Sequence, residues 1–259
     1  MESYNKEHAD NPIDIRYTDA DASAALIDLY NGRYDDIMNL FKPSAIWEGI
    51  VRIVPNIPQT LEIAAIAAVI GIVLGFLLAL FRIKKFPVLS QFAALYISFM
   101  RGTPLMLQLI AVYFGPWYLF RIRISDGYRF YAVIIAFVLN YAAYFAEIYR
   151  AGIAAVPKGQ REAAAVLGYT NAQAFFRIVL PQVIKHILPP MANEFITLIK
   201  DTSLAFAIGV MEMFTLAKQI SSAQRSMAPL IAAAVFYYVF NAIVAFIMGR
   251  AEKRLDYYR

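Results

Sequence analysis

The sequence has no cysteine and only two histidines, His8 and His186, which lie far apart in the chain. A disulfide framework and a thiolate metal site are therefore excluded, and the histidines show no ligand spacing. The sequence also has no GxxxxGK[ST] phosphate-binding loop and no visible nucleophile–base–acid arrangement. We therefore expect this chain to hold no catalytic residue, no metal and no cofactor.

Charge is scarce and unevenly distributed. Of the 259 residues, 17% are charged and 60% are hydrophobic, and the mean hydropathy of +0.54 is too high for an ordinary soluble domain. Residues 1–52 hold five Lys/Arg against ten Asp/Glu, and the remainder holds nineteen against nine. This basic excess flanks apolar segments, which indicates orientation at membrane lipid rather than nucleic-acid binding. We predict an all-α membrane protein.

The polar front of the chain is predicted to be an acidic extension, residues 1–50, before a membrane domain at residues 51–250. Its residues 20–40 could form amphipathic helices, either as a docking tail or as a loosely ordered surface arm. Residues 1–40 have no continuous apolar stretch of the signal-peptide kind, so we expect the first span to act as its own insertion signal.

The membrane domain is predicted to contain about five transmembrane helices, because its apolar stretches approach the ~20 residues that cross a bilayer. The predicted spans are residues 57–81, 89–120, 130–149, 187–211 and 226–249. The second is interrupted at Arg101-Gly102-Thr103-Pro104, and such a break needs protein or a water-filled cavity around its backbone. We expect Arg101 to anchor that helix end near the cytoplasmic surface.

Small residues form a stripe along the first span, where Ala67, Gly71, Gly75 and Ala79 recur every four positions. This pattern is typical of close helix packing in membranes.

Basic residues predict the orientation of the spans. Arg82, Lys84 and Lys85 follow the first span, and residues 251–259 form a basic tail. Because positive residues favour the cytoplasmic side, we expect the amino terminus outside and the carboxyl tail inside. Arg121, Arg123 and Arg129 precede the third span on the expected outer side and are an exception to this bias.

A polar, basic hairpin of two short helices is predicted at residues 158–182, whose sequence is KGQREAAAVLGYTNAQAFFRIVLPQ. Gly168 is a typical left-handed helix stop, and Thr170 with Gln173 forms a capping-box pattern for a second helix. Pro181 should kink or end that helix. Its basic residues place the hairpin in the cytoplasm.

This hairpin resembles the EAA loop of ATP-binding-cassette importer permeases. The matching residues keep the family spacing without a gap and are Glu162, Ala163, Ala164, Gly168, Ile178, Leu180 and Pro181. The segments RGTP, YFAEIYRAGIAAVPKGQREAA and NEFITLIKDTSL also resemble the polar-amino-acid branch of that family. The resemblance implies a type I permease fold in which these residues, with Thr170, couple the permease to an ATPase.

The resemblance also implies the partners. They are a separate ATPase subunit that binds ATP and Mg²⁺, a second permease that is a copy or a paralogue, and an extracytoplasmic solute-binding protein. The expected cargo is a small polar amino acid, and the expected location is the bacterial cytoplasmic membrane.

Polar residues within the spans are candidates for the transport path, because ionisable groups are costly inside a membrane. Asn140, Tyr144 and Glu147 share one helix face, and Glu194 and Asp201 share another. The neighbouring candidates are Asn193, Lys200 and Thr202. These groups could bind an amino acid, they could form hydrogen bonds and ion pairs between helices, or they could lie at the cytoplasmic interface.

Two other functions remain compatible with the sequence. An ion-coupled secondary transporter could use the intramembrane carboxylates to bind a cation, although five spans without an inverted repeat argue against it. A membrane subunit that anchors an ATPase without transporting would carry the same hairpin.

Overall fold

The computed structural model describes residues 43–84, 86–224 and 226–255. The chain divides into two units, residues 1–46 and 47–259, and the second is described here. Most of the predicted acidic extension and the end of the basic tail lie outside the described residues.

The described part is helical throughout and contains no strand. Its elements in order are α3 (Pro43–Ile53), η1 (Val54–Asn56), α4 (Ile57–Ile83), α5 (Pro87–Gly102), α6 (Leu105–Phe120), α7 (Tyr128–Ala155), α8 (Lys158–Val166), α9 (Asn171–Ala174), the π-helix η2 (Phe175–Val179), α10 (Leu180–Asp201), the 3-10 helix η3 (Thr202–Ile208), α11 (Met213–Gln224) and α12 (Ala228–Arg254).

Three helical stretches are long and apolar enough to cross a membrane, and they contain α4, α7 and α12. The pair α5 and α6 passes the same test only together, with a bend of 108° at the predicted break. The predicted span at residues 187–211 differs from the structure, where α10 begins at Leu180 and ends at Asp201. By length and composition the described part thus has up to four candidate spans. Helix α10 is not among them because its polar residues and prolines lower its mean hydropathy, and the expected number of about five spans stays a prediction.

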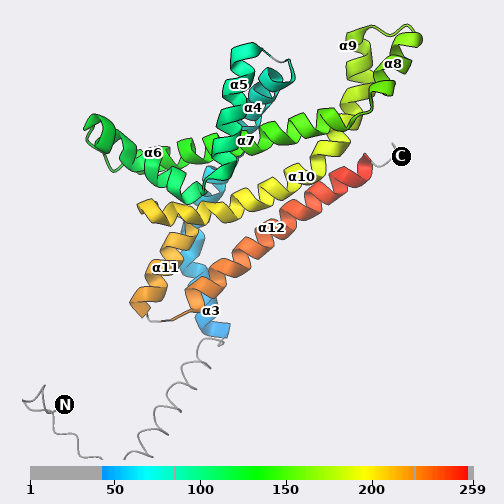
Figure 1. Ribbon diagram of the computed structural model, residues 1–259. Helices are drawn as coiled ribbons and strands as arrows, with labels where there is room; N and C mark the ends of the chain where they lie inside the picture. Colours follow the sequence, from blue (N-terminus) through cyan, green and yellow to red (C-terminus); the bar gives the residue numbers. More distant parts are fainter. Residues whose placement is uncertain (1–42, 85, 225, 256–259) are drawn as a thin grey trace, which may run out of the picture. The chain divides into compact units, whose positions relative to one another are not determined.

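Helix α7 lies at the centre of the unit and packs against α4, α5, α6 and α10 (Figure 1). Its contact with α4 is the most extensive in the unit. The small-residue stripe is confirmed, since Gly71 and Gly75 are buried against α7. At Gly75 the fit is so close that an added Cβ would lie 2.7 Å from the Cβ of Phe145.

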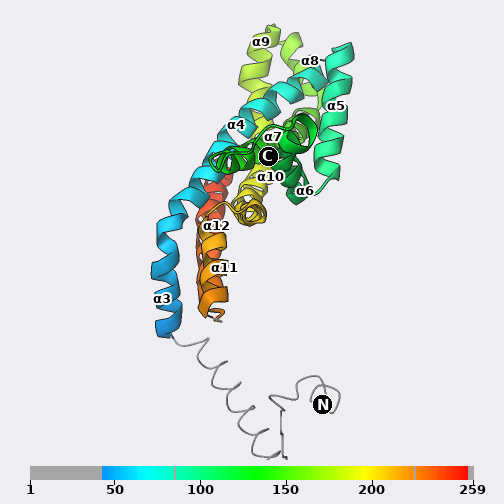
Figure 2. The ribbon, with the colours of Figure 1, turned by 90° about the vertical axis from the view of Figure 1, so that its left-hand side faces the viewer.

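The hairpin of α8 and α9 projects from one end of α10 in both ribbon views (Figures 1 and 2). Gly168 has a φ of +79°, which confirms the left-handed stop. The capping box between Thr170 and Gln173 is also confirmed.

The second helix of the hairpin is not short, and this part of the prediction was wrong. It continues from α9 through the π-helix η2 into α10, so that Pro181 lies in the first turn of α10 instead of ending a helix. In the π-helix the N–H of Leu180 donates to the carbonyl of Phe175, five residues earlier. This wider turn directly precedes Pro181, which has no N–H to donate, so the helix continues past a position where the usual α-helical hydrogen bond cannot form.

A buried carboxylate joins three elements at the other end of α10. Glu212 is fully buried and accepts hydrogen bonds from the N–H groups of Phe214 (2.8 Å) and Thr215 (2.6 Å). The hydroxyls of Tyr237 (3.3 Å) on α12 and Thr60 (3.4 Å) on α4 also point to it. These bonds hold the segment before α11 against α4 and α12.

Candidate functional site

The predicted coupling residues divide between the surface and the interior of the hairpin. Glu162, Ala163, Gly168 and Thr170 are exposed, whereas Ala164 is 1% exposed and packs inside the hairpin. The remaining three coupling residues lie half-buried on the second helix: Ile178, Leu180 and Pro181. Ala164 is therefore small because of packing within the hairpin, and Ala163 is the alanine that a partner could approach.

Two exposed apolar residues on the hairpin were not predicted as coupling residues. Val166 and Leu167 are 88% and 74% exposed at the end of α8. The sequence already showed two aliphatic residues directly before the helix stop at Gly168, and this was the available signal. They extend the exposed surface of the hairpin toward Gly168 and give it an apolar tip that suits a protein partner.

Two cavities lie along α7 and α10. The first, about 320 Å³, is lined by residues that include Arg101, Glu147 and His186. The second, about 370 Å³, is lined by residues that include Asn140 and Asp201. We call them the first and the second chamber. Tyr144 and Glu194 line both, so the chambers adjoin each other.

Five of the predicted path residues line these chambers, and they are Asn140, Tyr144, Glu147, Glu194 and Asp201. The other three do not line either chamber. Asn193 and Lys200 are exposed, and Thr202 is buried with its hydroxyl donating to the carbonyl of Ile199 (2.7 Å). Within the NEFITLIKDTSL segment, the face of α10 that lines the chambers carries Glu194, Thr197 and Asp201. Thr197 was not among the predicted path residues.

Hydrogen bonds hold two of the chamber residues in place. Asn140 donates to the side-chain oxygen of Gln108 at 2.9 Å, and Gln108 in turn donates to the hydroxyl of Thr103 at 2.7 Å. Asp201 accepts a hydrogen bond of 2.8 Å from the hydroxyl of Tyr141. Gln108 was missed from the sequence, although a glutamine in an apolar helix is a recognisable signal. It supports the backbone at the α5–α6 break by donating to the carbonyl of Met100 as well.

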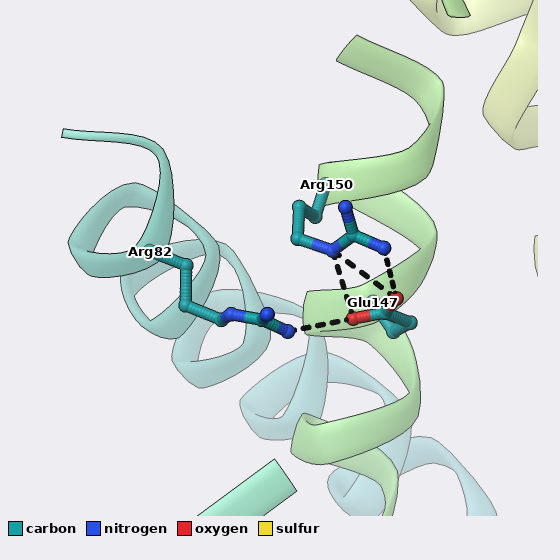
Figure 3. Close-up of polar contacts among 3 residues, drawn as sticks. All are labelled: Arg82, Glu147 and Arg150. Atoms are coloured by element: carbon teal, nitrogen blue, oxygen red, sulfur yellow. Dashed lines mark hydrogen bonds and ion pairs between the residues drawn. The ribbon is translucent and has the colours of Figure 1, made fainter. Parts of the chain in front are cut away.

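Glu147 is held between two arginines (Figure 3). Arg82 on α4 lies 3.0 Å from one carboxylate oxygen, and the Nε of Arg150 lies 3.1 and 3.0 Å from the two oxygens. The Nη2 of Arg150 also bonds to this carboxylate. Glu147 lines the first chamber, but its carboxylate is already engaged in joining α4 to α7. This arrangement favours the interhelical interpretation of Glu147.

Arg101 is exposed near the end of α5. Its guanidinium group is 5.5 Å from the centre of the Tyr144 ring, and the residue lines the first chamber. The bend between α5 and α6 brings Arg101 beside the chamber, and its role as an anchor at the cytoplasmic surface stays a prediction. Among the described residues that line the chambers, Arg101 is the one arginine. Glu194 and Asp201 are the lining carboxylates that take no part in the ion pairs of Glu147.

Residues 71–257 match the family model described as the binding-protein-dependent transport system inner membrane component. The chain belongs to this family. Over 219 residues it is 42% identical to the L-cystine transport system permease protein TcyL of Bacillus subtilis (strain 168), which covers 83% of the chain and 92% of the relative. It is 40% identical over 213 residues to the arginine transport system permease protein ArtQ of the same organism, covering 82% and 96%.

Solved structures agree with this membership. A crystal structure of an amino acid ABC transporter with histidines aligns with a TM-score of 0.71 and 35% identity, covering 78% of the chain and 93% of that structure. The inward-facing MetNI methionine ABC transporter aligns with a TM-score of 0.62 at 16% identity, covering 83% and 99%, which supports the fold alone. This chain is therefore a multi-pass inner-membrane transport component with the permease fold of ABC importers.

Proposed function

We propose that this chain forms the transmembrane path of an ATP-binding-cassette importer for a polar amino acid. The observation that carries the proposal is the continuous helical route from the hairpin to the chambers. The second helix of the hairpin runs through η2 into α10, and α10 carries both Glu194 and Asp201. A displacement of the hairpin would therefore move the chamber carboxylates with it, as one packed element.

The exposed face of the hairpin is the surface through which a separate ATPase would act. Glu162, Ala163, Val166 and Leu167 are accessible there, and Gly168 sets the turn. ATP and Mg²⁺ bind to that ATPase subunit, which closes on binding ATP and pushes the hairpin. The complex contains a second permease, identical or related, and receives its cargo from an extracytoplasmic solute-binding protein. The hairpin and the carboxyl tail face the cytoplasm, and the amino terminus faces outward.

The chambers contain charged groups of both signs, which complement the two charges of an amino acid. Arg101 can pair with an α-carboxylate, and Glu194 with Asp201 can attract an ammonium group. Relatives named for cystine and arginine transport, at 42% and 40% identity, support an amino acid as the cargo.

Substitution of Gly168 tests the coupling role. Gly168→Asp puts a side chain on a residue whose φ is +79° and adds a carboxylate to the exposed turn, so it disturbs both the left-handed stop and the surface proposed to meet the ATPase. In proteoliposomes that contain the full complex, we expect ATP-driven uptake to fall at least tenfold while the permease remains inserted. Gly127→Asp is the control, because Gly127 is the exposed residue just before α7, outside the hairpin, and an added Cβ there meets no atom within 4 Å.

Normal ATP-dependent uptake by the Gly168→Asp complex, at normal membrane levels, would contradict the coupling role. Collapse of the ion gradient in the same vesicles separates an ATP-driven importer from a secondary transporter. Uptake that persists after collapse supports the proposal, and uptake that stops with the gradient overturns it. A subunit that only anchors an ATPase would give no uptake in either condition.

A further inference from the structure

A third cavity, of about 510 Å³, lies between α10 and α12, outside the coupling surface. On α10 it is lined by Lys185 and His186, followed by Pro189 and Pro190. On α12 it is lined by Gly249, Glu252 and Lys253. We call it the α10–α12 pocket. Its lining has two lysines against one glutamate, so it favours an anionic group even with His186 neutral.

The pocket lies where both helices change from apolar to basic. Along α12 the charge-free stretch of residues 226–249 ends at Gly249, and Arg250, Lys253 and Arg254 follow. Along α10 the basic pair Lys185-His186 directly precedes apolar Ile187 and Leu188. Because both boundaries meet in one cavity, the pocket is at the depth of lipid headgroups if α12 spans the membrane.

Apolar surface lies next to the pocket on the membrane side. Phe246 and Ile247, within one turn of Gly249, are 61% and 57% exposed, and Ile243 is exposed one turn further back. A ligand held in the pocket by a charged group can therefore lay hydrocarbon chains on α12. This arrangement favours a phospholipid over free phosphate, because free phosphate has no hydrocarbon chain that could contact the apolar surface.

Pro190 adds a hydrogen-bond acceptor beside the pocket. It has no N–H, so the carbonyl of His186 lacks the helical donor four residues later. Such a carbonyl can accept a hydrogen bond from a hydroxyl of a glycerol headgroup. Lys185 makes an interaction of its own, and Lys253 is the exposed cation of the pocket.

We propose that the α10–α12 pocket binds the phosphate headgroup of an anionic phospholipid, such as phosphatidylglycerol, with its chains lying along α12. The assignment to the cytoplasmic leaflet rests on the orientation in the proposed function, whereas binding itself does not. Lys253 pairs with the phosphate, and Gly249 leaves the space that the headgroup fills. An added Cβ at Gly249 meets no atom within 4 Å.

Lipid binding to the purified full-length chain tests this proposal without any transport assay. Native mass spectrometry of detergent-solubilised protein, titrated with phosphatidylglycerol or phosphatidylcholine, measures the affinity for each lipid. We expect tighter binding of phosphatidylglycerol, and a loss of about tenfold in Lys253→Gln from one charge-assisted contact. Gly249→Trp should lower the affinity similarly, because the indole fills the cavity while leaving every charge in place.

Matched variants lie away from the pocket. Lys218→Gln removes an exposed cation on α11, and Gly115→Trp adds the same bulk where a Cβ also meets no atom within 4 Å. Both should bind phosphatidylglycerol as the parent does. Equal affinity in Lys253→Gln and in the parent would overturn the proposal, as would displacement of the lipid by equimolar inorganic phosphate. Because lipid affinity is measured and uptake is not, the result is independent of transport. Lipid binding can be found in a chain that does not transport, and it can be absent from a chain that does.

Discussion

Two glutamates in the first chamber differ in how their charges are compensated. Glu147 has Arg82 and Arg150 within ion-pair distance, whereas no ion pair within 4.0 Å is found for Glu194 in the described chain. A charge inside a membrane that already has two cationic partners contributes to packing, and one without them is available to a ligand. The two residues, both candidates for the path from the sequence, are therefore expected to have different roles.

We expect Glu194→Gln to raise the KM for cargo about tenfold or more, because it removes a charge that would meet an ammonium group, a contact worth ~1.5–3 kcal/mol. Its thermal midpoint should stay close to that of the parent. Glu147→Gln should show the reverse, with a lower thermal midpoint from the loss of partners for Arg82 and Arg150, and a nearly unchanged KM. Uptake kinetics in proteoliposomes and thermal unfolding in detergent measure the two effects. An equal rise of KM in both variants would show that Glu147 binds cargo as well.

Adjacent tyrosines on α12 provide a second comparison. Tyr237 donates to the buried carboxylate of Glu212 at 3.3 Å, whereas Tyr238 is 76% exposed. Tyr237→Phe should lower the free energy of unfolding by ~1–2 kcal/mol, because a buried charge loses a donor. Tyr238→Phe should have no measurable effect. Thermal unfolding of the two variants in one detergent is the measurement, and similar midpoints would mean that the hydroxyl of Tyr237 is dispensable.

At the scale of elements, the pairing of α4 with α7 depends on small residues that the sequence displayed clearly. From Ala67 to Ala79 every fourth position of α4 is small, and α7 lies directly against that face. The spacing alone predicted close packing, since helix periodicity puts such residues on one face. It did not predict which helix would be the partner or which glycine would be the point of closest approach.

Alanine substitutions at Gly75 and Gly71 test how closely α4 and α7 approach each other, through their effect on stability. At Gly75 a Cβ would lie 2.7 Å from the Cβ of Phe145 and 2.9 Å from the carbonyl oxygen of Ala142, neither of which can move without a backbone shift. Gly75→Ala should therefore destabilise the protein by ~1–3 kcal/mol. At Gly71, one turn away, the nearest atom would be at 3.4 Å, an ordinary contact. Gly71→Ala should be tolerated, and an equal loss of stability in both variants would contradict the close approach at Gly75.

The coupling hairpin shows where local signals are sufficient and where they fail. The turn at Gly168 and the cap at Thr170 were predicted because each depends on residues within one helical turn. The continuation past Pro181 was not, because proline usually kinks or ends a helix and the π-helix that precedes it here is not visible in the sequence. This continuation is what connects the hairpin to the chambers.

At the scale of the whole molecule, the orientation in the membrane remains a prediction from the distribution of basic residues. The absence of cysteine makes it directly testable, since any introduced thiol is unique. Val166 is 88% exposed on the hairpin, and Ile122 is 56% exposed between α6 and α7. These two sites should lie on opposite sides of the membrane.

We expect a membrane-impermeant maleimide to label Ile122→Cys in intact cells and to label Val166→Cys only after the membrane is opened. Addition of the ATPase subunit should then reduce labelling of Val166→Cys by severalfold, because the hairpin becomes covered. Labelling of Val166→Cys from outside would place the hairpin on the wrong side for an ATPase and would contradict the proposed function.

The sequence by itself determined that this is a helical membrane protein, where its second span breaks and where the hairpin turns. Each of these features depends on composition or on residues that are neighbours along one helix. Only the tertiary structure decided which polar groups meet, because Arg82 and Glu147 are 65 positions apart and Tyr141 and Asp201 are 60 apart. The same packing placed Arg101 beside a chamber and turned Ala164 inward, since side chains far apart in the chain determine which face of a helix is covered.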